Sequence, residues 1–148
     1  LVGWLRQADQ WERMALMFQL EVAERICAEP DSSAYGRLAV LAQWCASCSV
    51  VLRIPPGAFS PPPKVNSAIA LLIPHKQQPS PDLFRAMEQV TAAAFGQRRK
   101  MLRSSLKPIG GEALLEKAGI LATRRAETLT VEEFNRLAEL HLDNKKKA

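Results

Sequence analysis

The sequence predicts an α/β protein in which strands and helices alternate up to about residue 75 and only helices follow. Short apolar runs of strand length occur in the first half, whereas the second half repeats its apolar residues at helical spacing. A proline-containing stretch, residues 74–81, separates the two patterns. We therefore expect a mixed region at 1–75, a linker at 76–81 and a helical domain at 82–148.

The mixed region is expected to contain three strands and two helices. Apolar and β-branched runs predict the strands, at residues 13–19, 49–54 and 65–73. Helical spacing of apolar residues predicts the helices, at 20–28 and 35–46. A proline-rich loop joins the last two strands, which we expect to form an antiparallel pair at a sheet edge.

Four helices are expected after the linker, at residues 82–95, 97–107, 112–118 and 131–142. The last of them is preceded by Thr130, with Glu133 three residues on, which is the spacing of a capping box.

Composition indicates a globular protein, with 47% hydrophobic and 24% charged residues. No apolar run approaches the roughly 20 residues of a membrane helix, and no signal peptide is recognisable, so we expect a cytoplasmic protein. The chain starts with Leu1, within a helical pattern, which indicates an incomplete chain. Cys27, Cys45 and Cys48 lack the partners of a zinc site, and we interpret them as buried structural thiols.

The net charge of +5 is concentrated in one short segment. Basic and acidic residues balance in 1–96 and again in 108–148, so the surplus falls within 97–107. As a helix, this segment would place Phe95, Leu102 and Leu106 on one apolar face. Its cations are Arg98, Arg99, Lys100, Arg103 and Lys107, without an acidic residue for pairing. We interpret it as a phosphate-binding surface, the alternative being a solvated helix face.

The proline loop carries a second candidate site. Phe59 precedes Pro61, Pro62 and Pro63, and Lys64 follows them. A rigid loop would present Phe59 as a platform for stacking on a base, with Lys64 reaching a phosphate. The alternative, that Phe59 packs into the core, is equally compatible with the residues alone.

Four segments in this order resemble the bacterial small-subunit ribosomal RNA adenine dimethyltransferases (the KsgA type). They are residues 18–25, 35–40, 59–68 (Phe-Ser-Pro-Pro-Pro-Lys-Val-Asn-Ser-Ala) and 94–103 (Ala-Phe-Gly-Gln-Arg-Arg-Lys-Met-Leu-Arg). The resemblance implies the rear part of a Rossmann-like methyltransferase sheet followed by a small helical RNA-binding domain. It also implies an S-adenosylmethionine enzyme that dimethylates two adjacent adenines of small-subunit rRNA, with Phe59 packed against the target adenine. No membrane association is expected, and the protein is expected to be a monomer.

Two sequence features of that family are missing here. The glycine-rich cofactor loop and the Asn-Leu-Pro-Tyr segment are not found, and both would lie N-terminal to Leu1. We therefore expect no catalytic, cofactor-binding or metal-binding residue in this chain, and no activity from it alone. The alternatives are a non-catalytic RNA-binding or ribosome-assembly factor, and a large-subunit (erythromycin-resistance type) dimethyltransferase, which shares the Phe59 loop.

Overall fold

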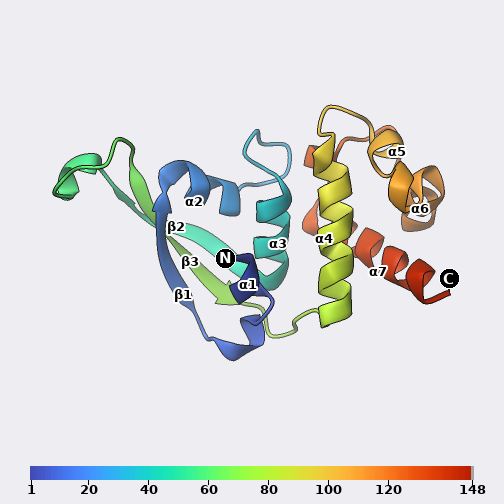
Figure 1. Cartoon of the computed structure of the whole chain (residues 1–148), viewed down its shortest axis with the longest axis horizontal. Helices are drawn as coiled ribbons and strands as arrows, with labels where there is room; N and C mark the ends of the chain where they lie inside the picture. The colour runs from blue at the N-terminus through green and yellow to red at the C-terminus, as the bar shows by residue number, and fades with distance from the viewer. Residues whose placement is uncertain (148) are drawn as a thin grey trace.

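The computed structural model describes residues 1–147 and combines a three-stranded sheet with a helical region (Figure 1). The strands are β1 (Met14–Gln19), β2 (Ala46–Ile54) and β3 (Ser67–Pro74). The α-helices are α1 (Val2–Leu5), α2 (Leu20–Ile26), α3 (Arg37–Cys45), α4 (Pro81–Gly96), α5 (Leu102–Ser105), α6 (Gly111–Ala118) and α7 (Val131–Lys147). Single 3-10 turns lie at Ala8–Gln10, Pro56–Ala58, Lys107–Ile109 and Ala126–Thr128. The predicted α/β class, with helices alone after the sheet, is confirmed.

The sheet has the order β1-β3-β2, and both pairs of neighbours are antiparallel. The predicted antiparallel pair of the last two strands is therefore confirmed, with β2 at one edge and β3 in the middle. A bulge interrupts the β2–β3 register between Val50 and Leu52. Because β1 and β2 both run opposite to β3, they end at the side of the sheet where β3 begins.

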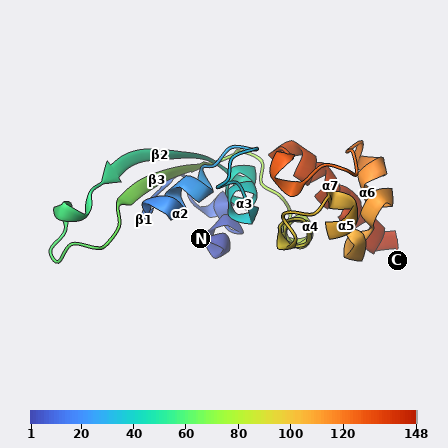
Figure 2. The same ribbon diagram turned by 90° about the horizontal axis from the view of Figure 1, so that it is seen from above.

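One face of the sheet is packed against helices. Ala68, Ala70 and Leu72 alternate along β3 and are fully buried, because α2 and α3 lie on that side of the sheet (Figure 2). On the opposite face, Met17 is 57% exposed and Ile73 is 41% exposed. This alternation is the period-two pattern of a strand with one covered face.

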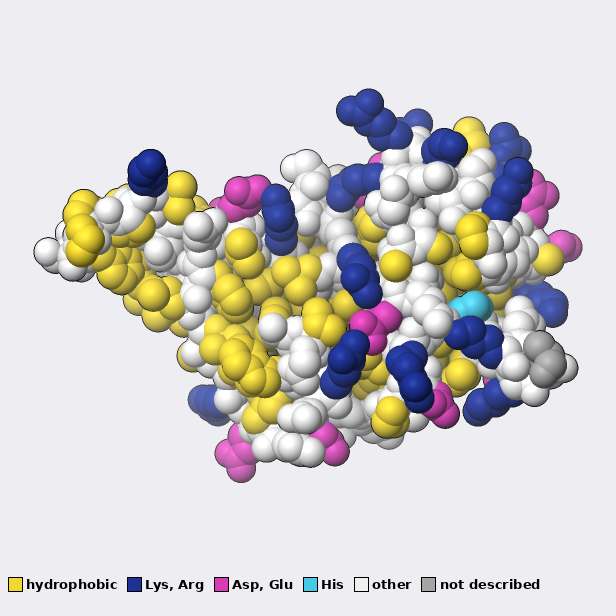
Figure 3. All heavy atoms as spheres, viewed as in Figure 1, with side chains coloured by type: hydrophobic (Ala, Val, Ile, Leu, Met, Phe, Trp, Pro, Cys, Tyr) yellow, Lys and Arg dark blue, Asp and Glu magenta, His cyan; other side chains and the backbone are white. Residues whose placement is uncertain are grey.

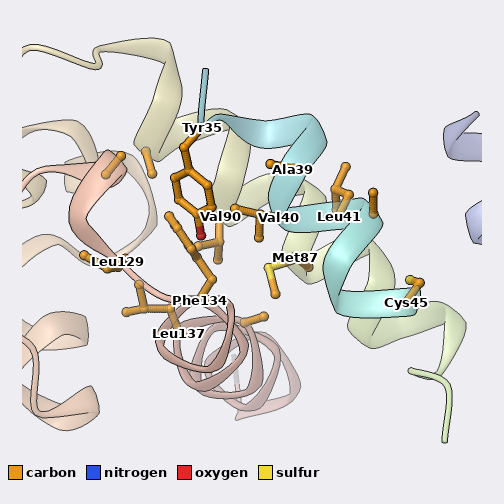
Figure 4. Close-up of a cluster of buried hydrophobic side chains, with 14 of the residues drawn as sticks. Tyr35, Ala39, Val40, Leu41, Cys45, Met87, Val90, Leu129, Phe134 and Leu137 are labelled. Carbon is orange, nitrogen blue, oxygen red and sulfur yellow. The ribbon is translucent and has the colours of Figure 1, made fainter. Parts of the chain in front are cut away.

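The core continues from the sheet region into the helical region. Tyr35, just before α3, contacts the ring of Phe95 in α4 edge-on at a centroid distance of 6.1 Å. Phe95 in turn lies 5.6 Å from Phe134 of α7. Met87 and Val90 of α4 are fully buried in the same cluster (Figure 4). The expected regions 1–75 and 82–148 thus share an apolar interface, formed by α3, α4 and α7.

The prediction of one helix over residues 97–107 is wrong. Helix α4 ends at Gly96, and Met101 adopts an extended conformation (φ −66°, ψ 151°) before α5 begins. The cause is a contact with a distant segment: the N–H of Leu102 donates to the carbonyl of Arg124 (2.7 Å), and that of Arg103 to Ala122 (3.0 Å). These N–H groups would bond within the predicted helix, so bonding to residues 122–124 replaces helical bonds with tertiary ones.

The capping box before α7 is confirmed. The N–H of Glu133 donates to the hydroxyl of Thr130 (3.2 Å), and the N–H of Thr130 donates to the Glu133 carboxylate (3.0 Å). Arg124 also forms an ion pair with Glu133. Burial alone would raise the pKa of Glu133, but the hydrogen bonds from Arg124 and from the backbone of Thr130 outweigh burial and lower it.

The interpretation of the cysteines as structural thiols agrees with their surroundings. Cys45 is fully buried, Cys27 and Cys48 are half-buried, and none forms a disulfide. Burial raises the pKa of Cys45 and of Cys48 to about 12, so both thiols are protonated at neutral pH. Within residues 1–147, no group of three or more His, Cys, Asp or Glu side chains is arranged to hold a metal ion.

None of the helices in residues 1–147 has both the length and the apolar composition that crossing a membrane requires.

Candidate nucleic-acid interface

The loop that carries Phe59 projects from the end of the sheet where β1 and β2 terminate (Figure 1). It starts after Ile54, forms a single 3-10 turn at Pro56–Ala58 and re-enters the sheet at Ser67. The loop therefore extends beyond the carboxyl ends of β1 and β2.

Within that loop, Phe59 is half-buried and is not part of the hydrophobic core. This placement removes the alternative in which Phe59 packs into the core, and it leaves an aromatic ring near the tip of the loop. Lys64 is exposed, and Val65 beside it is 48% exposed. An aromatic ring and a cation thus share one projecting loop, a combination suited to an unstacked base and its phosphate.

The basic segment, residues 97–107, consists of a turn followed by the short helix α5. Four of its cations are exposed, and the ion pairs found in residues 1–147 include none of them: Arg99, Lys100, Arg103 and Lys107. Figure 3 shows Lys and Arg side chains gathered above the end of α4. Such a cluster without paired carboxylates is a surface that a polyanion would stabilise.

Arg98 differs from its neighbours. Its guanidinium group donates to the carbonyl oxygens of Ser32 (3.3 Å) and Ser33 (3.1 Å) and lies 6.0 Å from the centre of the Phe95 ring. The side chain therefore ties the end of α4 to the loop before α3. We assign Arg98 a packing role and leave it out of the phosphate-binding surface, although sequence reasoning had grouped it there.

The Phe59 loop and the basic segment lie on the same side of the molecule, with α2 and the loop before α3 between them (Figure 1). The bonds of Arg98 hold the basic segment against this intervening loop. A hydrogen bond from the N–H of Asp31 to the carbonyl of Glu127 (2.8 Å) joins the same loop to the 3-10 turn at Ala126–Thr128. The two sites are thus presented on one side of the molecule.

The chain has extensive similarity to known proteins. The sequence profile of the family described as "Ribosomal RNA adenine dimethylase" matches residues 1–143. "Ribosomal RNA small subunit methyltransferase A" of Gluconobacter oxydans is 82% identical over 142 residues, covering 96% of this chain and 47% of the relative. The protein of the same name from Mesorhizobium japonicum is 57% identical, covering 93% of this chain and 50% of the relative. The chain thus spans about half the length of the curated relatives it matches.

Two solved structures share the fold. A dimethyladenosine transferase from Plasmodium falciparum has a TM-score of 0.69 at 22% identity, and the superposition covers 86% of this chain and 56% of the Plasmodium chain. The 23S rRNA methyltransferase ErmE has a TM-score of 0.64 at 24% identity and covers 96% of this chain and 59% of its own. From the profile match over residues 1–143 and the identity to these relatives, the chain belongs to the ribosomal RNA adenine dimethylase family.

Proposed function

We propose that this chain is the RNA-holding part of an enzyme that dimethylates two adjacent adenines of small-subunit ribosomal RNA during ribosome assembly. The observation that carries the proposal is the 82% identity to a protein named as a small-subunit rRNA methyltransferase, over 96% of the chain. The small ribosomal subunit is the proposed partner, the cytoplasm the proposed location, and a monomer the proposed state. Residues 1–75 are proposed as part of the catalytic domain and 82–148 as the RNA-binding domain.

The proposed roles of the residues follow from their placement. Phe59 stacks on the target adenine once that base has left its helix, which contributes about 1–3 kcal/mol by comparison with other base-stacking sites. Lys64 contacts a phosphate next to that base. The exposed cations of the basic segment bind the RNA backbone and set its position, because phosphate contacts fix register without reading sequence.

S-adenosylmethionine is the proposed cofactor, but the residues described here do not fit it. The chain passes from the end of β1, Gln19, directly into α2 at Leu20, without the glycine turn at which nucleotide-like ligands approach a backbone. No Gly-x-Gly occurs anywhere in the sequence. The relatives are about twice as long as this chain. We therefore propose that the cofactor is held by residues corresponding to the additional part of the relatives, and that this chain alone is inactive.

A large-subunit enzyme is the second candidate, because the fold of ErmE covers 96% of this chain. At 24% identity that likeness concerns the fold alone, whereas the relatives at 56% identity and above are named for the small subunit. The preference for small-subunit rRNA rests on this difference. A non-catalytic assembly factor is the remaining rival, and a methylation assay distinguishes it from the enzyme.

The test uses a chimaera in which this chain replaces the matching residues of the Gluconobacter relative. Phe59→Ala should lower methyl transfer to small ribosomal subunits about tenfold or more while subunit binding changes little, since one stacking contact is lost among many phosphate contacts. Val65→Ala, which shortens another exposed side chain of the same loop, serves as the matched control. Equal methyl transfer by the wild type and the Phe59→Ala variant would show that the ring does not hold the adenine.

A further inference from the structure

A pocket of about 600 Å³ lies beside the end of α4, among the residues of the basic segment. Its volume is within the range of small-molecule binding pockets, roughly 300–1,000 Å³. Small residues of α4 form one wall: Ala92, Ala93 and Gly96. A Cβ atom added at Gly96 would meet nothing within 4 Å, so a ligand can approach the helix backbone closely at this point.

The rest of the lining is largely polar and cationic. Lys100 and Lys107 line it together with the amide of Gln97 and the hydroxyl-bearing Ser104, and no carboxylate is among the lining residues that the structure describes. The backbone of Lys107 is held by the turn that follows it, where the N–H of Gly110 donates to the carbonyl of Lys107 (3.3 Å). Two cations and several donors without a competing acid form a site suited to a phosphate group.

Ser105 contributes to the lining of this pocket a hydroxyl group that has no hydrogen-bond partner within residues 1–147. The residue is only 5% exposed. Buried hydroxyl groups are nearly always paired, because an unpaired one loses its hydration without compensation. A phosphate oxygen in the pocket would provide the missing acceptor after a rotation of the side chain.

We propose that this pocket binds one backbone phosphate of the RNA, held by Lys100, Lys107 and the hydroxyl of Ser105. The inference rests on the proposed function, since it takes RNA as the polyanion, and it makes the contact more specific. The exposed cations attract RNA along the whole segment, whereas the pocket receives a single phosphate between α4 and α5. It also adds Gln97, Ser104 and Ser105, which carry no charge, to the interface.

The test fills the pocket without changing any charge. Gly96→Leu adds an isobutyl group at a position whose Cβ site is open, and Gly3→Leu makes the same change at another open glycine, in α1. With a labelled RNA hairpin in a filter-binding assay, Gly96→Leu should weaken binding about tenfold and reduce the slope of log K against log salt by about 1. Gly3→Leu should leave both unchanged. Unchanged affinity of a folded Gly96→Leu variant would overturn the proposal.

Ser105→Ala provides a second test that does not depend on steric blocking. It removes the unpaired hydroxyl, so the melting temperature of the free protein should be equal or higher while RNA affinity falls about threefold. Equal affinity would remove Ser105 from the site.

Two further results separate the possible failures. If Gly96→Leu binds normally but Arg99→Gln with Arg103→Gln binds weakly, the pocket is wrong and the RNA-binding proposal stands. The other result is that inorganic phosphate alone raises the melting temperature of the wild type but not of Gly96→Leu. If the two proteins then bind RNA with equal affinity, the pocket binds free anions and its assignment to RNA is overturned.

Discussion

Replacing Arg99 and Arg103 by glutamine is the perturbation that most directly probes the basic segment. Both side chains are exposed, and neither takes part in the ion pairs found in residues 1–147. The change therefore removes two positive charges without leaving an acidic residue unpaired or disturbing the core. Leu102, which anchors the same short helix, is fully buried and is left untouched.

The size of the effect follows from counterion release. Each phosphate contact contributes about 0.9 to the slope of log K against log salt on duplex nucleic acid, so losing two contacts reduces the slope by about 1.8. Between 50 and 200 mM salt, log salt changes by about 0.6. The fold-loss in binding constant over this range should therefore be about ten times larger for the wild type than for the variant. The variant should therefore bind far more weakly at low salt and approach the wild type at high salt.

The assay is filter binding of a labelled RNA hairpin at four or more salt concentrations. Arg13→Gln with Lys76→Gln is the matched control: it makes the same charge change just before β1 and between β3 and α4, away from the Phe59 loop and the basic segment, at exposed side chains that are likewise outside the ion pairs found in residues 1–147. The control should retain the wild-type slope, apart from a small uniform loss of affinity. Equal slopes for both double variants would show that the effect is one of net charge, and would refute a specific phosphate-binding surface.

Two further predictions concern stability. Tyr35 is fully buried and its hydroxyl has no partner in the described part of the chain. Tyr35→Phe should therefore stabilise the protein by about 1 kcal/mol, which corresponds to a rise of roughly 2–4 °C in melting temperature. An unchanged or lower melting temperature would contradict this. Glu133 has a pKa lowered below its usual 4.5, so its stabilising effect is present above that pH and is lost as the pH falls through the folded-state pKa. The difference in melting temperature between the wild type and Glu133→Gln should accordingly be largest near neutral pH and shrink in acid, and a difference that does not vary with pH would disprove the assignment.

The sheet was predictable because its elements carry local signals. Apolar strand patterns identified β1, β2 and β3 to within three residues at either end, and the capping box located the start of α7. The position of β3 between β1 and β2 was not predictable from such signals. Strand order is decided by which faces are buried together, and that depends on the whole chain.

The break in the basic segment escaped prediction for a related reason. Phe95, Leu102 and Leu106 have helical spacing, and no proline or glycine lies between Gln97 and Lys107. What separates α5 from the preceding turn is the pairing of the N–H groups of Leu102 and Arg103 with backbone carbonyls at Arg124 and Ala122, more than fifteen residues further along the chain. The spacing of apolar residues along the sequence contains no information about such a contact.

The candidate site was only partly visible in the sequence. Charge counting identified the exposed cations, but it could not separate Arg98, whose guanidinium is used by the carbonyls of Ser32 and Ser33. Ser105 carries no charge and belongs to no motif that marks it. Its importance appears only when its burial and its lack of a partner are seen together.

The central claim, that this chain serves an enzyme acting on small-subunit rRNA, is tested most directly by locating the methyl groups. The chimaera with the Gluconobacter relative would be incubated with labelled S-adenosylmethionine and unmodified small and large subunits, and the rRNA digests analysed by mass spectrometry. The account predicts N6,N6-dimethyladenine at two adjacent adenines of the small-subunit rRNA. Methyl groups in large-subunit rRNA instead, or none from a folded chimaera whose parent relative is active, would contradict it.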